Sequence, residues 1–104
     1  MEAARREELD ALQRVREDVR VSARALTDAR DRLAARQRLL AIEERKLASE
    51  RENFQRGRSS TDLIVRFQQD VSRARVSLLR ARVEEAAARL DWGRALGLLR
   101  EALP

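Results

Sequence analysis

A row of apolar residues recurs at every seventh position through the first half of the chain. The row consists of Leu12, Val19, Leu26, Leu33, Leu40, Leu47 and Phe54. The opposite face of a helix drawn over the same stretch carries only charged residues: Asp10, Glu17, Arg24, Asp31, Arg38, Arg45 and Glu52. A strict seven-residue apolar repeat is typical of a coiled-coil seam, and an all-charged face belongs in water. The pattern therefore predicts one long helix over about residues 3–56.

The second half of the chain carries two neighbouring rows with the same spacing. One row consists of Ile64, Val71, Leu78, Glu85, Trp92 and Leu99, and the other of Phe67, Ala74, Ala81, Ala88, Ala95 and Ala102. Small side chains along the second row allow another helix to approach closely. These rows predict a second helix over about residues 62–100.

Residues 57–61, between the two predicted helices, have the chemistry of a turn. Gly57 suits the left-handed position that ends a helix. Ser59 or Ser60 can accept hydrogen bonds from the free N–H groups of the next helix, and with Ser59 as the cap Asp62 would stand three residues on, as in a capping box. Asp62 also suits the positive end of the helix dipole. The sequence thus predicts an all-α fold, a single antiparallel helical hairpin over residues 1–104 with its tip at 57–61.

Folding the chain at this turn aligns the apolar rows of the two helices. With paired residue numbers that sum to about 118, the expected pairs are Phe54 with Ile64, Leu47 with Val71, Leu40 with Leu78, Leu26 with Trp92 and Val19 with Leu99. The one discord is Leu33 opposite Glu85. Because a carboxylate in a seam needs a partner, we expect a nearby arginine to pair with Glu85, the candidates being Arg30, Arg36, Arg82 and Arg89.

The second helix carries a further apolar stripe that a two-helix hairpin does not use. This predicted packing seam consists of Val65, Val76, Leu79, Val83 and Leu90, and rows of arginine lie on both sides of it. The first helix has a weaker second stripe of Val21, Ala25, Ala35, Leu39 and Ile42. A helix with two apolar stripes packs between two neighbours. We therefore expect the hairpin to assemble into a larger helical bundle or barrel.

Composition removes several classes of function. The chain has 104 residues and contains neither cysteine nor histidine, which excludes disulfides, thiolate chemistry, the usual zinc ligand sets and histidine acid–base catalysis. The net charge is +5, but 18 acidic residues are mixed among the arginines, so we expect no nucleic-acid partner. No apolar run reaches the roughly 20 residues of a membrane-spanning helix. We expect no enzyme activity, cofactor or metal, because no two carboxylates converge and no nucleophile has a base beside it.

The turn and the second helix resemble a known family. The likeness rests on Phe54, Gly57, Ser60, Leu63, Ile64, Ala74, Leu78, Ala81, Leu90 and the closing LDWGRALG of residues 90–97. An aromatic residue three positions before a glycine is followed by a hydroxyl, an acidic residue and an apolar cluster, and then by a long alanine-spaced helix that ends in ALG. Over about residues 35–97 these features are similar to the final hairpin of the outer-membrane efflux protein family, the TolC-like channels.

The resemblance implies a role in a channel wall. In that family three subunits form one α-helical tunnel across the periplasm, and the hairpin tips meet a periplasmic adaptor protein. The chain would then be the second-repeat periplasmic hairpin of an outer-membrane efflux channel, located in the periplasmic portion of an outer-membrane protein. It would self-associate, as a homotrimer in the full-length family and as a dimer for this piece, and touch the membrane only through parts absent from this chain.

The family's site residues transfer to two groups in this sequence. The adaptor-docking tip would consist of Gly57, Arg58, Ser59, Ser60, Thr61 and Asp62. The subunit-packing seam would be the second stripe of the second helix, Val65, Val76, Leu79, Val83 and Leu90. Two departures stand against a full match: the family's acidic residue falls one position later, where Leu63 stands, and its members are several times longer, with β-strands that build a barrel.

Two other interpretations remain open. The α-hairpin of a periplasmic adaptor protein also carries glycine and serine at its tip, but it would run into a β-rich lipoyl-like segment, which LDWGRALGLLREALP does not offer. A free-standing coiled-coil scaffold or a designed hairpin is the other. Against an idealised design stand the unused second stripe and Glu85 in an apolar row.

Overall fold

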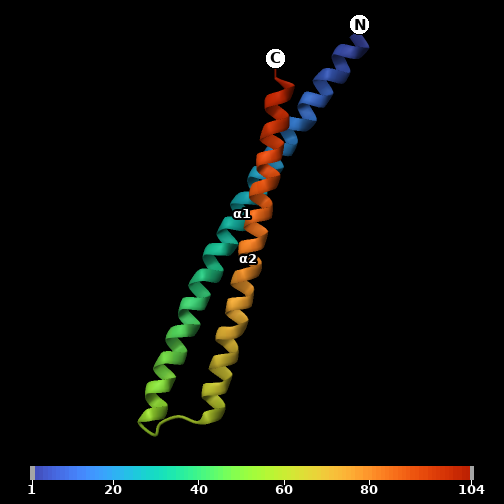
Figure 1. Cartoon of the computed structure of the whole chain (residues 1–104). Helices are drawn as coiled ribbons and strands as arrows, with labels where there is room; N and C mark the ends of the chain where they lie inside the picture. The colour runs from blue at the N-terminus through green and yellow to red at the C-terminus, as the bar shows by residue number, and fades with distance from the viewer. Residues whose placement is uncertain (1, 104) are drawn as a thin grey trace. The chain divides into compact units, whose positions relative to one another are not determined.

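Two long helices make up the described part of the chain. The computed structural model describes residues 2–103, which contain α1 (Glu2–Gln55) and α2 (Thr61–Ala102) and no strand. The helices run antiparallel and are joined by one short connection (Figure 1). The fold is thus the all-α helical hairpin that the heptad rows predict, and each helix end differs from its predicted position by one or two residues.

The hairpin divides into two compact units. The tip unit spans Asp31–Val83 and contains the end of α1, the connection and the first half of α2. The terminal unit combines Met1–Arg30 with Glu84–Pro104. Each unit packs one segment of α1 against one segment of α2, so each has its own part of the predicted seam.

The core of the tip unit follows the predicted rows. Its buried side chains are Leu47, Val71, Ala74, Leu78 and Ala81. The alanines alternate with the larger residues, as close helix packing requires. At the edge of this core the Lys46 ammonium nitrogen lies 5.2 Å from the centroid of the Phe67 ring, a cation–π contact between the two helices.

One predicted seam residue of the tip unit is not buried. Phe54 was expected to meet Ile64, but Phe54 remains 47% exposed and Ile64 is only partly buried. Because α1 ends at Gln55, no further helical turn remains to cover the Phe54 ring. The seam therefore closes at Leu47, one heptad earlier than predicted.

The terminal unit buries Leu26, Ala29 and Ala95, and its core row includes a carboxylate. The Glu85 side chain is only 13% exposed and lies between two arginines. Arg30 Nε is 3.6 Å from Glu85 Oε1, and a guanidinium nitrogen of Arg89 is 3.6 Å from Glu85 Oε2. This confirms the expectation that arginines balance Glu85, with one partner from α1 and one from α2.

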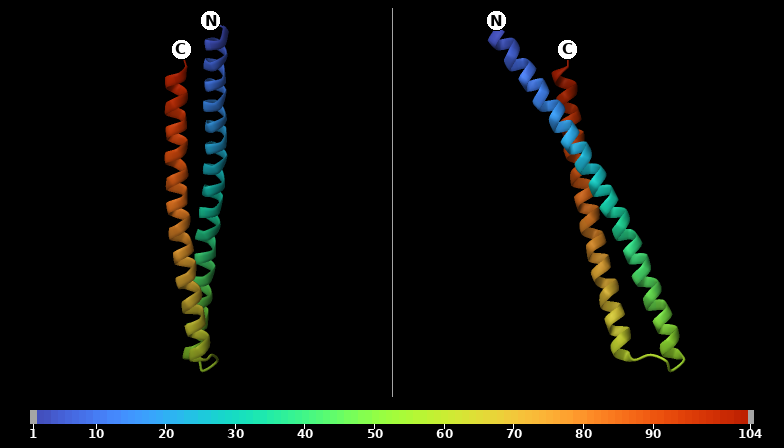
Figure 2. Two further views of the ribbon diagram at one scale, coloured as in Figure 1. Left: turned by 90° about the vertical axis from the view of Figure 1, so that its right-hand side faces the viewer. Right: turned by 180° about the vertical axis from the view of Figure 1, so that it is seen from behind.

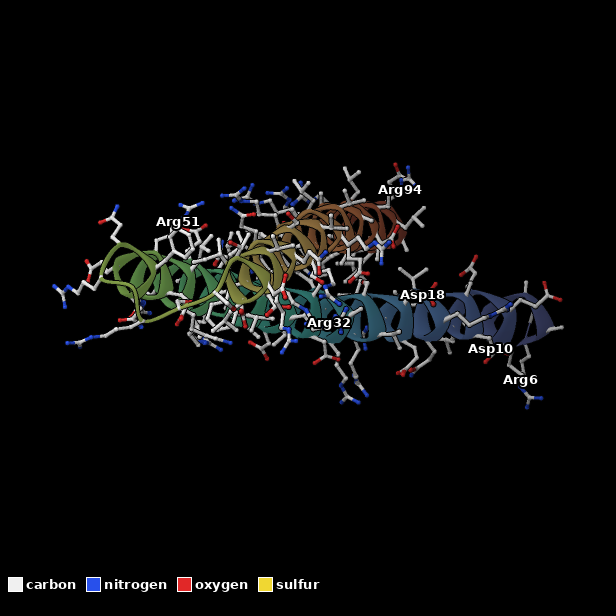
Figure 3. The ribbon with its side chains drawn as sticks, turned by 90° about the horizontal axis from the view of Figure 1, so that it is seen from below. Arg6, Asp10, Asp18, Arg32, Arg51 and Arg94 are labelled. Atoms are coloured by element: carbon white, nitrogen blue, oxygen red, sulfur yellow. The ribbon has the colours of Figure 1, made fainter. Side chains whose placement is uncertain are left out.

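Toward the chain ends, the two helices of the terminal unit diverge (Figure 2). Residues 2–11 of α1 are all exposed, and in Figure 3 the side chains of Arg6 and Asp10 project away from α2. An open groove lies between the diverging ends and is lined by apolar side chains that include Leu9, Leu12 and Leu103. The first turns of α1 have no helical partner in the described chain.

Candidate assembly surfaces

The tip begins with a complete helix-ending motif. Gly57 has φ +75°, its N–H donates to the Phe54 carbonyl at 3.0 Å, and the Arg58 N–H donates to the Asn53 carbonyl at 2.8 Å. These two bonds form a Schellman motif, which satisfies carbonyl groups that the last helical turn leaves free. The prediction that Gly57 is the left-handed residue within two positions of the end of α1 is confirmed.

Ser60, rather than Ser59, is the N-cap residue of α2. The Leu63 N–H donates to Ser60 Oγ at 3.3 Å, and the Ile64 N–H donates to the Ser60 carbonyl at 3.2 Å. Asp62 is therefore the second helical residue and not the third, so the capping box that required Ser59 as the cap is not formed. Asp62 still lies in the first turn, where its charge is favourable to the helix dipole.

Most of the predicted docking tip faces solvent. Gly57, Arg58, Ser60, Thr61 and Asp62 are exposed, while Ser59 is partly buried and its Oγ has no hydrogen-bond partner within residues 2–103. The fold itself requires Gly57 and Ser60. The side chains of Arg58 and Thr61 form no hydrogen bond or ion pair to the described residues, so they are free to contact another molecule.

The predicted packing seam on α2 is open along the chain. In the tip unit Val65, Val76, Leu79 and Val83 are 44%, 49%, 57% and 69% exposed, and in the terminal unit Leu90 is also exposed. We call the four residues of the tip unit the outer stripe. A shallow surface groove lined by Val65, Gln68, Gln69, Ser72 and Arg73 lies at one end of it. The outer stripe is therefore an apolar surface with no covering element in the described chain.

The second stripe of α1 is weaker, as the sequence indicates. Val21 and Ile42 are large and exposed, Ala25 and Ala35 are exposed but small, and Leu39 is partly buried. These residues offer isolated apolar side chains rather than a continuous strip. Single exposed apolar residues are ordinary on protein surfaces, and a contiguous strip is the informative observation.

Sequence reasoning missed three exposed leucines of the terminal unit. Leu9, Leu98 and Leu103 are 59%, 54% and 47% exposed, and Leu98 lines a small groove with Val15 and Ala95. Leu9 and Leu103 border the open groove where the helices diverge. The unequal lengths of the two predicted helices do indicate that about the first dozen residues have no partner within the chain, which accounts for Leu9 but not for Leu98 or Leu103.

Within residues 2–103 no helix is long and apolar enough to cross a membrane, and no three acidic residues gather where a metal ion could bind. Comparison with protein-family models, with curated proteins and with solved structures gives no match to the chain. The open apolar stripe and the exposed tip are therefore the features on which a function can be argued.

Proposed function

We propose that this chain is a wall segment of a larger helical assembly, in which the outer stripe of α2 packs against a neighbouring helix. The observation that carries the proposal is the exposure of Val65, Val76, Leu79 and Val83 at coiled-coil spacing on a helix whose other face is already buried. The α2 helix then packs between two neighbours, one of them α1. A hairpin with this property would be one component of a helical assembly rather than a self-contained domain.

The energy available from the outer stripe supports assembly. Full burial of one valine or leucine side chain is worth about 1.5–3 kcal/mol, so covering the stripe is worth several kcal/mol. That amount is comparable to the total stability of a small domain, about 5–15 kcal/mol. Part of it is offset by the loss of freedom on association. A partner helix would still gain much from covering these four side chains.

The more specific form of the proposal follows the family resemblance. The chain is proposed to be the periplasmic α-barrel hairpin of a TolC-like outer-membrane efflux channel, self-associating with other copies around a tunnel. The tip, from Gly57 to Asp62, is proposed to dock a periplasmic adaptor protein. Its support is the turn pattern, the exposure of Arg58 and Thr61, and the exposed second apolar stripe of α2, which a neighbouring helix in a tunnel wall would cover.

Self-association through the outer stripe is the direct test of the wall role. We would measure sedimentation equilibrium of the chain at about 1 M salt, where the Debye length is about 3 Å and charge repulsion is screened. The chain is expected to associate, and the double variant Val76→Lys, Val83→Lys is expected to remain a folded monomer.

The matched control for this test changes two exposed apolar residues elsewhere. Val21→Lys with Ile42→Lys alters the same kind of side chain on α1 and is expected to leave association unchanged. If the unmodified chain stays monomeric at high micromolar concentration in high salt, the outer stripe does not pack against a second copy. The self-associating form of the wall-segment proposal would then be wrong.

A further inference from the structure

The outer stripe is bordered almost entirely by arginine. In a coiled coil the positions that flank a seam face the flanking positions of the partner helix. Around the outer stripe five of these six positions are arginine, and the sixth is Gln68: Arg66, Arg73 and Arg80 lie on one side, and Arg75 and Arg82 on the other. All five arginines are exposed. None of these six positions carries a carboxylate, and the nearest acidic residues at the ends of the stripe are Asp62 and Glu84.

Most of these arginines have no ion-pair partner among residues 2–103. Arg73 forms an ion pair with Asp70, at 3.2 Å, and this is the one carboxylate partner of the five arginines within residues 2–103. Asp70 is also the only acidic residue between Leu63 and Val83. The surface around the stripe therefore presents four uncompensated guanidinium groups next to an apolar strip.

The arrangement disfavours pairing between the outer stripes of two copies. Whether the two copies run parallel or antiparallel, aligning their valines and leucines brings arginines of one copy opposite arginines of the other. Like charges at such positions destabilise a helix pair by about as much as opposite charges stabilise it, a few tenths of a kcal/mol each. At moderate salt the same face of a second copy is therefore a poor occupant.

We propose that the outer stripe receives a partner helix whose own apolar seam is flanked by glutamate or aspartate. This inference rests on the proposed wall role and names the chemistry of the neighbour. Gln69 and Ser72 occupy the seam positions between Val65 and Val76. A polar group within a seam fixes register, so the partner also carries a polar residue opposite this pair.

The narrow width of the outer stripe favours a partner helix over an anionic membrane surface as the molecule that binds it. Helices that lie on membranes have a broad apolar face that includes Trp or Phe. The outer stripe consists of valine and leucine alone, and arginine follows directly on each side. Such a narrow strip suits the two-residue-wide seam of a partner helix.

Three synthetic peptides test the inference against the whole chain. Each is a helix of roughly four heptads, a length that can form a helix on binding, with valine and leucine at the seam positions except for one polar residue to face Gln69 and Ser72. The flanking positions are glutamate in one peptide, glutamine in the second and lysine in the third. Fluorescence anisotropy is expected to show about tenfold tighter binding of the glutamate peptide than of the glutamine peptide, and no binding of the lysine peptide, at about 0.1 M salt. This preference is expected to disappear at about 1 M salt.

Charge-reversal variants of the chain sharpen the test. Arg66→Glu with Arg80→Glu leaves three flanking arginines against two glutamates, so it is expected to remove most of the preference, and the glutamate and glutamine peptides should then bind about equally. Both residues are exposed and neither forms an ion pair in the described chain, so the fold is expected to persist, as circular dichroism would check. Arg38→Glu with Arg45→Glu makes the same charge change on the charged face of α1 and is expected to change nothing.

Three outcomes would overturn the inference. Equal binding of the three peptides would show that charge does not select the neighbour; with self-association retained in high salt, the wall role would stand without it. Tighter binding to phosphatidylglycerol–phosphatidylcholine vesicles than to the glutamate peptide, lost in the Val76→Lys, Val83→Lys variant, would make a membrane the occupant. Absence of both peptide binding and self-association would remove the inference together with the proposed function.

Discussion

The two faces of α2 in the tip unit both carry apolar residues at heptad positions, although Gln69 and Ser72 interrupt the outer one, and the chain covers only the inner face. Val71, Ala74, Leu78 and Ala81 are buried against α1, whereas Val65, Val76, Leu79 and Val83 face solvent. Apolar periodicity alone marks both faces as seams. What separates them is the alanines, which let α1 approach the inner face, and the flanking charges.

The charged residues that flank each face of α2 explain why a helix such as α1 suits the inner face and not the outer stripe. The inner face is bordered by Asp70 and Ser77 on one side and by Arg75 and Arg82 on the other, so a helix of mixed charge such as α1 can pack there without net repulsion. The outer stripe has arginine on both sides. An apolar seam with flanks of one sign therefore points to a neighbour of the opposite sign, outside the pairing that makes the hairpin.

The largest effect is expected from truncating adjacent leucines on the two faces. Leu78 is 7% exposed and Leu79 is 57% exposed, although they are neighbours in the sequence. Leu78→Ala should lower the free energy of unfolding by about 2–4 kcal/mol, because it removes a buried side chain and leaves a cavity. Leu79→Ala should change it by less than about 0.5 kcal/mol. Denaturation followed by circular dichroism at low protein concentration measures both, and similar losses would contradict the distinction between the faces.

The next prediction compares Gly57 with Gly93, because the fold requires glycine at the first position and not at the second. Gly57→Ala should cost about 1–2 kcal/mol, since an alanine at φ +75° is strained even though nothing lies within 4 Å of the added methyl group. Gly93 lies inside α2, also with open space around it, so Gly93→Ala should stabilise the chain by up to about 1 kcal/mol. Thermal unfolding would show melting temperatures shifted in opposite directions. A stabilising Gly57→Ala would mean that the Schellman turn is not the form of the tip in solution.

Glu85 tests whether the inner face of the terminal unit is optimised for stability. Glu85→Leu should raise the free energy of unfolding by about 1 kcal/mol, because an apolar residue of similar size replaces a carboxylate whose desolvation offsets its two ion pairs. Glu101→Leu, on an exposed position of α2, is the control and should change little. A measured gain would show that Glu85 serves register or assembly rather than stability. Destabilisation by Glu85→Leu would show that Arg30 and Arg89 contribute more than the apolar contact.

Most of the fold could be predicted from heptad spacing and from the backbone preferences of single residues. The heptad rows locate both helices and the inner seam, Gly57 marks the end of α1, and the position of Glu85 calls for an arginine, found as Arg30 and Arg89. These features depend on spacing within a helix or on one residue's backbone freedom. They are therefore readable without knowledge of the whole structure.

The features that sequence reasoning missed depend on single-residue placement or on other molecules. The exposure of Phe54 depends on its place in the last turn of α1, beside the connection, where heptad spacing alone does not report burial. The choice of the cap depends on which of two adjacent hydroxyls the connection places at the start of α2. A neighbour of the outer stripe would belong to another molecule, so the arginines of this chain support only a proposal about its charge.

The smallest expected effect on stability comes from removing the hydroxyl group of Ser60 or of Ser59. Ser60 Oγ accepts the Leu63 N–H, so Ser60→Ala should lower the free energy of unfolding by about 0.5–1 kcal/mol through the loss of a helix cap. Ser59 Oγ is buried and has no hydrogen-bond partner in residues 2–103, so Ser59→Ala removes an unsatisfied polar group. That variant should be neutral or slightly stabilising in the same denaturation measurement. The reverse order, with Ser59→Ala the more harmful change, would place the start of α2 one residue earlier. It would also restore the capping box with Asp62 and turn the first residues of the outer stripe relative to the tip.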